Sequence, residues 1–308
     1  MANINRNLTG HAACWFSGVL TLTICLSIIV FLIIKGANVI SWQFLTENPQ
    51  PSLQEALSGG ILIPIIGTIL LVGLGTLFAF PWALATAIYL SEYGGDNQWV
   101  NSLRAGIDVL AGVPTIVFAI FGLAIFTHPG LSFFSTMVEG VANAKAFGRS
   151  FLVSAFTMAM MVLPFVTKSM EEAIRAVPQT YKEAAYAIGI SKWRTIYKVV
   201  LPAATAGIIT GIILGVGRIA GDTAIVWLCL GGSMSMTGPQ PWWIPQNWLD
   251  TMQNTGSTLT SYVYYSSPAG EGNSPNKAFG AGLVLIIIIL ALNSLVDYLG
   301  KFTRVKEG

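Results

Sequence analysis

Long uncharged stretches alternate with short charged segments along most of the chain. A helix that crosses the hydrocarbon core of a bilayer, about 30 Å thick, needs about 20 apolar residues. Six segments meet this requirement, with approximate limits 14–34, a part of 56–91, 108–126, 150–167, 199–230 and 278–299. The pattern therefore predicts an all-α integral membrane protein with six transmembrane helices.

The first two segments need further interpretation. The first begins at Cys14, lacks a small-residue cleavage site and is too long for a signal-peptide core, so we expect it to remain as an anchor. The second uncharged stretch has 36 residues, too few for two spans with a turn and too many for one. One long helix with an interfacial lead-in, bent at Pro64 or Pro81, fits this length best.

Composition agrees with a membrane protein and excludes several classes of function. Hydrophobic residues make up 54% of the 308 residues and charged residues 10%, whereas about 25% of a soluble domain is charged. This excludes a soluble enzyme, a disordered chain and a nucleic-acid-binding protein, and the net charge of +2 provides no face for a polyanion. The three cysteines and two histidines are dispersed, so neither a metal site nor a Ser-His-Asp arrangement is expected.

Lysine and arginine residues indicate the orientation in the membrane. With the N-terminus inside, eleven of the sixteen lie on the cytoplasmic side and four outside, while Arg218 lies within the fifth span. We therefore expect cytoplasmic tails at 1–13 and 301–308 around a transmembrane domain at 14–300. The outer segment 231–277 is rich in glycine, proline and interfacial tryptophan, and it is not expected to form a seventh span.

The cytoplasmic segment 168–198 has a helical pattern of its own. Pro178 suits the first position of one short helix, which Gly189 can close in a left-handed conformation. Ser191 can cap a second helix that runs to Leu201 and Pro202. Each helix has one apolar stripe. Two interpretations stay open at this point, an amphipathic pair on the lipid surface and a docking element for a cytoplasmic partner.

This segment resembles the cytoplasmic loop of ATP-binding-cassette importer permeases. The pattern of that loop is EAA-x3-G-x9-I-x-LP, which matches Glu183-Ala184-Ala185, Gly189 and Leu201-Pro202, with Val199 at the Ile position. Further stretches look like the A-type permease of the phosphate importers, namely 59–62, 87–93, 111–117, 171–178 and 218–224. The resemblance covers most of the chain from about residue 45 onward.

The resemblance implies a set of partners in a bacterial cytoplasmic (inner) membrane. They are a related C-type permease that forms a heterodimer with this chain, two copies of a cytoplasmic ATPase and an extracytoplasmic phosphate-binding protein. The residues implied to couple to the ATPase are Glu183, Ala184, Ala185 and Gly189. ATP and Mg²⁺ would be bound by the ATPase, and no cofactor is expected in this chain.

The sequence also indicates a non-catalytic role independently of the resemblance. No G-x-x-x-x-G-K-[ST] motif occurs in the chain, so the phosphate-cradling loop of an ATPase is absent. A secondary carrier would usually show repeated halves, and no such repeat is visible. We therefore expect a transport subunit rather than an enzyme.

The fifth span contains the candidate translocation site, formed by Arg218, Asp222 and Thr223. At 100° per residue, Arg218 and Asp222 share one helix face with a stripe of glycines, namely Gly207, Gly211 and Gly215. Glycines would let a neighbouring helix pack closely or leave room for a solute. The planar fork of arginine can donate two parallel hydrogen bonds to phosphate, and Asp222 is expected to hold Arg218 when the path is empty.

Alternatives remain for this site and for the function. The charged pair could be an ion pair that only holds the fold, or a gate at the outer mouth. The importer family usually has Glu and Pro where this chain has Asp222 and Ile225, which bears on anion specificity. The predicted function is ATP-driven import of inorganic phosphate. A permease for another oxyanion and a membrane sensor of phosphate status without a through-path are the alternatives.

Overall fold

The computed structural model describes residues 2–50, 59–95, 97–136, 147–233, 243–272 and 274–303, with side chains described from residue 10 to 300. Five stretches of this part are long and apolar enough to cross a membrane. They contain the helices α1 (Ala2–Gly36), α3 (Leu62–Ile88), α6 (Phe151–Arg175), α9 (Leu201–Gly221) and α12 (Pro275–Thr303). A bent pair, α4 (Gln98–Ala111) and α5 (Thr115–Phe126), makes a sixth when the two helices are counted together as one span. The prediction of an all-α protein with six spans is confirmed.

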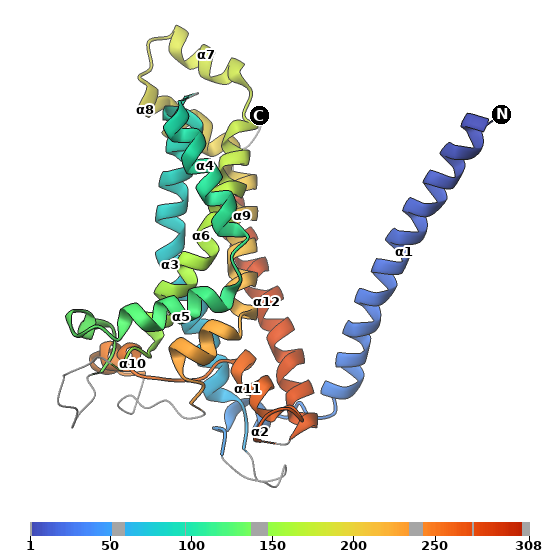
Figure 1. The fold of residues 1–308 in the computed structure, drawn as a ribbon, viewed down its shortest axis with the longest axis vertical. Helices are drawn as coiled ribbons and strands as arrows, with labels where there is room; N and C mark the ends of the chain where they lie inside the picture. Colours follow the sequence, from blue (N-terminus) through green and yellow to red (C-terminus); the bar gives the residue numbers. More distant parts are fainter. Residues whose placement is uncertain are drawn as a thin grey trace.

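The spans form a bundle from which α1 leans away (Figure 1). α3, α6 and α9 pack on one another, and α12 packs on α9 and α11 (Leu259–Ser266). α1 contacts α12 near its own C-terminal end, where the rings of Phe31 and Phe279 lie 5.5 Å apart. Both ends of the chain lie at the same end of the molecule as α7 (Gln179–Ala187) and α8 (Lys192–Thr195), called here the α7 end.

The opposite end is closed by short helices. They are α2 (Trp42–Thr46), η3 (Pro129–Phe134), η6 (Pro245–Asn247), α10 (Trp248–Gln253) and α11. No helix long enough to span a membrane occurs in the described part of 231–277, as predicted. The predicted tails fall partly outside the described residues, but α1 already begins at Ala2 and α12 continues to Thr303, so the helices extend into both predicted tails.

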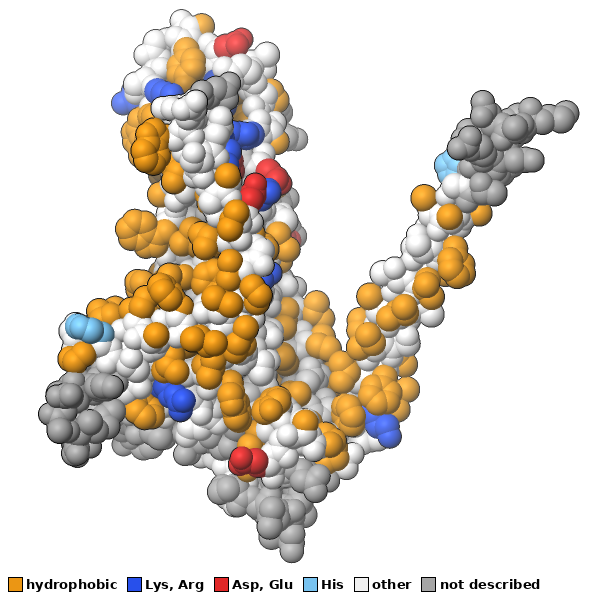
Figure 2. Space-filling model, viewed as in Figure 1, with side chains coloured by type: hydrophobic (Ala, Val, Ile, Leu, Met, Phe, Trp, Pro, Cys, Tyr) orange, Lys and Arg blue, Asp and Glu red, His pale blue; other side chains and the backbone are white. Residues whose placement is uncertain are grey.

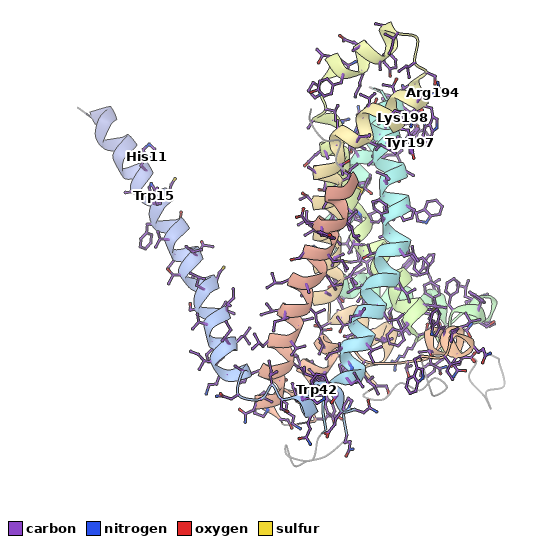
Figure 3. All side chains as sticks on the ribbon, turned by 180° about the vertical axis from the view of Figure 1, so that it is seen from behind. His11, Trp15, Trp42, Arg194, Tyr197 and Lys198 are labelled. Atoms are coloured by element: carbon purple, nitrogen blue, oxygen red, sulfur yellow. The ribbon has the colours of Figure 1, made fainter. Side chains whose placement is uncertain are left out.

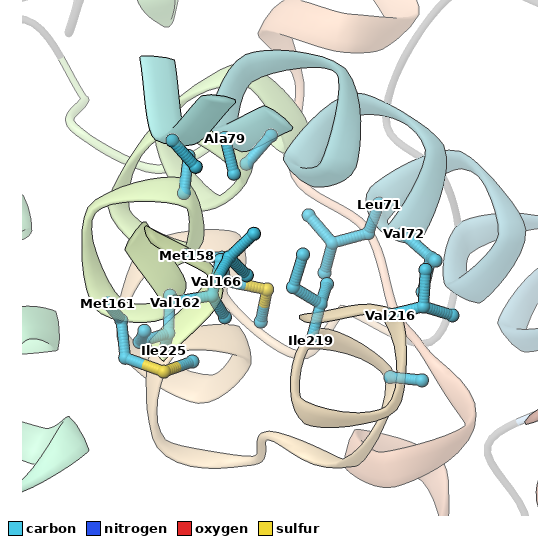
Figure 4. Close-up of a cluster of buried hydrophobic side chains, with 14 of the residues drawn as sticks. Leu71, Val72, Ala79, Met158, Met161, Val162, Val166, Val216, Ile219 and Ile225 are labelled. Atoms are coloured by element: carbon cyan, nitrogen blue, oxygen red, sulfur yellow. The ribbon is translucent and has the colours of Figure 1, made fainter. Parts of the chain in front are cut away.

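The centre of the bundle is an apolar core between α3, α6 and α9 (Figure 4). Leu71 of α3, Met158 of α6 and Ile219 of α9 are each at most 2% exposed. The glycine stripe of α9 faces α6, because a Cβ atom added at Gly207 would lie 2.3 Å from the Cβ of Ala173. Small residues bring helix backbones close enough for van der Waals contact, which drives helix association in lipid.

Apolar side chains also cover the outside of the bundle (Figure 2). Exposed examples are Leu77 and Trp82 of α3 and Leu290 of α12, each at least 60% exposed. Charged side chains gather mainly toward the α7 end in this view. Exposed apolar side chains around the bundle suit contact with lipid rather than with water.

The predicted third span, 108–126, is wrong in its start and in its shape. The helix begins at Gln98, breaks after Ala111, and resumes at Thr115 with a change of direction of 100°. Pro114 explains the break, because it lacks an N–H and holds an extended conformation (φ −59°, ψ 141°) before α5. The third segment therefore consists of two half-length helices joined at a sharp bend.

The predicted fifth span, 199–230, is wrong at both ends. The helical stretch begins at Lys192 and passes through a π-helical turn, η4 (Ile196–Val200), into α9. It ends at Gly221, because Asp222 is extended (φ −76°, ψ 133°) and a separate π-helical turn, η5 (Val226–Leu230), follows. Asp222 is therefore not on the helix face that carries Arg218.

The second and fourth spans also differ in detail from their predictions. α3 starts at Leu62 and continues past Pro81 into a π-helical turn, η2 (Tyr89–Tyr93). Pro64 lies in the first turn of α3, where the missing N–H costs little. α6 extends to Arg175 rather than ending near 167, and the Ser150 side chain caps its start by accepting from the Val153 N–H.

Candidate functional site

Two regions carry the predicted functional residues, the α7–α8 loop and the C-terminal end of α9. In the loop, α7 begins after Pro178, which is the N-cap rather than the first helical residue as predicted. Gly189 has a φ of +79° and its N–H donates to the Tyr186 carbonyl, so the predicted left-handed turn is confirmed. Ser191 precedes α8 but its side chain makes no capping hydrogen bond. The predicted second helix does not end at Pro202, since it continues into α9.

The predicted coupling residues lie at the tip of the molecule (Figure 1). Glu183, Ala184 and Gly189 are exposed, whereas Ala185 is 5% exposed and packs inward. Two large apolar side chains of the same loop, Ile188 and Trp193, are 76% and 62% exposed. The loop thus presents an apolar surface with charged neighbours beyond the end of the bundle.

Arg218 lies in the last turn of α9, half-buried against α6. Its guanidinium carbon is 3.8 Å from the centroid of the Phe165 ring, a cation–π geometry. Its Nε donates to the Met161 Sδ at 3.0 Å. In the described part of the chain Arg218 forms no salt bridge, so the predicted direct ion pair with Asp222 does not form, and the two charges interact only over a longer distance.

Asp222 connects two parts of the fold instead. Its carboxylate accepts from the Ile225 N–H at 2.8 Å, which holds the turn after α9. Its backbone carbonyl accepts from the Thr260 hydroxyl of α11 at 3.1 Å. Asp222 therefore ties the end of α9 to α11, at a place where a helix end in the bundle needs polar partners.

This chain departs from the family pattern at Asp222 and at Ile225, and these two residues are joined by a hydrogen bond. Ile225 is fully buried, and the hydrogen bond to Asp222 satisfies its N–H. A proline at this position would have no N–H to donate. The short aspartate side chain and the non-proline residue three positions later thus form one local unit.

Thr223 does not join Arg218 in a shared polar site. Its carbonyl accepts from the Trp227 N–H, but its hydroxyl makes no hydrogen bond within the described residues. Sequence reasoning missed Phe165 and Met161, because nothing in a run of apolar residues marks which one meets an arginine. It also missed Thr260, whose hydroxyl donates to the Asp222 carbonyl, because Thr260 lies on another helix.

A groove of about 620 Å³ lies away from these residues. It runs between α3, α9 and α12, near the α7 end, and its wall includes Phe80, Leu201 and Val296. Arg218 and Asp222 do not line it. The groove therefore does not provide the site for which the arginine was predicted.

The sequence and fold match those of known transport proteins. Residues 87–305 match the family described as "Binding-protein-dependent transport system inner membrane component". The phosphate transport system permease protein PstA 1 of Mycobacterium tuberculosis (strain CDC 1551 / Oshkosh) is 33% identical over 249 residues, which cover 80% of this chain and 73% of the relative. The phosphate transport system permease protein PstC of Pasteurella multocida is 27% identical, covering 87% and 82% of the two chains.

A solved structure agrees at the level of the fold. A chain from the crystal structure of a bacterial alginate ABC transporter, in complex with a periplasmic protein bound to an alginate pentasaccharide, superposes with a TM-score of 0.64. The match covers 98% of each chain at 15% identity. The family match covers more than half of the chain, and the helical arrangement is that of a transporter chain. The chain belongs to the family of binding-protein-dependent transport system inner membrane components.

Proposed function

We propose that the chain is the A-type permease of an ATP-driven importer that carries inorganic phosphate across the bacterial cytoplasmic membrane. The observation that carries this proposal is Arg218, a half-buried guanidinium that packs on apolar side chains and forms no salt bridge within the described residues. An arginine in a membrane bundle is costly and generally marks a transport route. A passing phosphate can satisfy its planar fork with two parallel hydrogen bonds. The names of the relatives support phosphate as the anion.

The proposal includes partners that supply the energy and the substrate. The permease would form a heterodimer with a related C-type permease, whose sequence kinship is illustrated by the Pasteurella relative. Two copies of an ATPase would bind ATP and Mg²⁺ and dock on the α7–α8 loop, and a binding protein would deliver phosphate outside. Exposed Ile188 and Trp193 at the tip of the bundle support docking of a protein rather than attachment to lipid.

The complex purified with its own partners and placed in proteoliposomes tests the proposed substrate. With binding protein outside and ATP inside, labelled phosphate should accumulate, and unlabelled sulfate or molybdate should compete weakly. Accumulation of sulfate or molybdate in place of phosphate would assign another oxyanion. Regulation by phosphate without any uptake would indicate a sensor, and either result contradicts the proposal.

We propose further that the α7 end faces the cytoplasm, so that both termini do as well. Arg194 and Lys198 lie at this end, whereas Trp42 lies at the opposite one (Figure 3). The excess of basic residues at the α7 end agrees with the rule that positive charge stays inside. The ATPase would then approach from the side where ATP is available.

Cysteine labelling tests this orientation. Single cysteines replace Ser191 and Ala269, which are both exposed and lie in the α7–α8 loop and in the connection from α11 to α12. Cys14, Cys25 and Cys229 are first replaced by alanine. A membrane-impermeant maleimide should label Ala269→Cys in intact spheroplasts and Ser191→Cys only after permeabilisation. Labelling of both positions from the same face would contradict the six-span topology.

A further inference from the structure

The π-helical turn η2, at the α7 end of α3, contacts several elements through polar side chains. Its wider turn is closed by the Gly94 N–H, which donates to the Tyr89 carbonyl at 2.8 Å. Such turns shift the hydrogen-bond register of a helix and often occur at functional positions. Basic residues from other helices contact three groups of η2, namely the Leu90 carbonyl, the Glu92 carboxylate and the Tyr93 ring.

The carboxylate is that of Glu92, which pairs with Lys182 of α7. The Lys182 Nζ donates to the Glu92 Oε1 at 2.5 Å. Both side chains are shielded from solvent, with exposures of 11% for Lys182 and 5% for Glu92. Removing one partner of a buried ion pair leaves an uncompensated charge and is strongly unfavourable, so this contact resists separation of α7 from α3.

The ring is that of Tyr93, which lies under Lys192 of α8. The Lys192 ammonium is 4.6 Å from the ring centroid, within the range of a cation–π contact. Both helices of the α7–α8 loop, called here the docking loop, thus contact η2 at the end of α3. Gly189 joins the two helices and gives the loop its bend.

The carbonyl is that of Leu90, which is held by Arg104 of α4. The Arg104 Nη2 donates to this carbonyl at 2.7 Å, and its Nε donates to the Glu171 carboxylate of α6 at 2.9 Å. Glu171 also pairs with Arg175 at 3.1 Å. One guanidinium therefore links η2 to both α4 and α6.

A continuous connection leads from the docking loop to the end of α9. Arg104 of α4 joins η2 to Glu171 of α6, and α6 also carries Phe165 and Met161, which contact Arg218. Arg218 lies four residues before Asp222 in the last turn of α9. A displacement of α7 would be passed through η2 to Arg104 of α4, and from Arg104 through Glu171 and α6 to the residues around Arg218.

We propose that η2 is the junction that couples the ATPase-docking loop to α4, with Lys182 and Glu92 as the positioning residues that transmit the movement. This inference rests on the proposed function, because it assigns a route to the coupling of ATP hydrolysis and anion transport. Neither residue contacts the anion. Their role is to keep α7 and the end of α3 moving as one body.

Charge removal and charge exchange in the complete complex test the junction. Lys182→Gln and Glu92→Gln should each lower phosphate uptake per ATP hydrolysed by about tenfold, within the usual range of coupling between sites. The double exchange Lys182→Glu with Glu92→Lys should restore most of that ratio, which loss of folding alone would not allow. Lys198→Gln is the matched control. Lys198 is an exposed lysine that comes shortly after α8 in the chain, and its ammonium lies over the ring of its neighbour Tyr197 rather than over a residue of η2. Wild-type ratios in both single variants would overturn the proposal.

A distance measurement separates this inference from the proposed function. Spin labels at Thr180 of α7 and Ser102 of α4, both exposed, report whether the two helices move together. In the wild-type complex the distance should stay constant between the nucleotide-free and ATP-trapped states, and in Lys182→Gln it should change. Equal behaviour of the wild type and the variant would refute the junction even if phosphate is imported. If the wild-type complex gives the expected distances but imports no phosphate, the result would refute the proposed substrate and leave the junction standing.

Discussion

Arg218→Gln is expected to lower phosphate uptake by about 100-fold, since loss of a charged two-pronged contact costs about 3 kcal/mol. Glutamine has a similar reach and can still pack on Phe165, so the variant should assemble with its partners. ATP hydrolysis by the complex should continue. The measurement is the initial rate of labelled phosphate uptake in proteoliposomes, normalised to assembled complex. Arg218→Lys should recover only part of the rate, because an ammonium is a point charge without the planar fork.

Substitution of Asp222 provides the matched control for the arginine. In Asp222→Asn the amide oxygen can still accept from the Ile225 N–H, and no ion pair with Arg218 is broken. We therefore expect uptake and thermal stability close to those of the wild type. The double variant Arg218→Gln, Asp222→Asn should be as inactive as Arg218→Gln alone. Near wild-type uptake in a well-assembled double variant would show that the arginine only packs.

Gly189→Val is expected to lower ATP-coupled uptake by about tenfold, because a β-branched residue at a φ of +79° strains the turn by about 1–3 kcal/mol. No atom lies within 4 Å of the added Cβ, so the effect would come from the backbone and not from a clash. The strain should displace α8 from α7 and weaken docking of the ATPase. Uptake, together with the amount of ATPase that co-purifies with the permease, measures this loss.

Two further variants separate the effect of the backbone conformation at Gly189 from the effect of the exposed charge on α7. Gly189→Asn should keep most of the uptake, because asparagine tolerates the left-handed conformation better than other residues with side chains. Glu183→Arg leaves the turn unchanged and reverses an exposed charge of α7, so we expect it to weaken ATPase docking as well. Full uptake in both Gly189→Val and Glu183→Arg would assign the loop to the lipid surface instead.

Features that depend on short stretches of residues could be predicted from the sequence. The six spans follow from apolar length, which the bilayer thickness sets directly. The glycine stripe and Arg218 share one face of α9 because helical periodicity is a local property, and that face does pack on α6. The turn at Gly189 was predictable for the same reason, since glycine adopts a positive φ at little cost.

Features that depend on contacts between distant residues were decided by the tertiary structure. The helical pattern around Asp222 is compatible with a continuous span, and the ion pair with Arg218 follows from that assumption. In the fold the carboxylate instead accepts from the Ile225 N–H, the Asp222 carbonyl accepts from Thr260 of another helix, and α9 ends at Gly221. A polar side chain in a bundle without water takes whichever partners lie nearest, and helical periodicity alone does not reveal them.

The junction at η2 shows the same division between sequence and structure. Lys182 and Glu92 are 90 residues apart, and Arg104 and Glu171 are 67 apart. Each charge taken alone is typical of a solvated helix end, so the sequence assigns it no partner. The sequence by itself predicted that charged helices would project beyond a six-span bundle. Only the packing of α3, α4, α6 and α7 decided which charges meet, because burial of a charge in this bundle is favourable only when an opposite charge or a free carbonyl lies within reach.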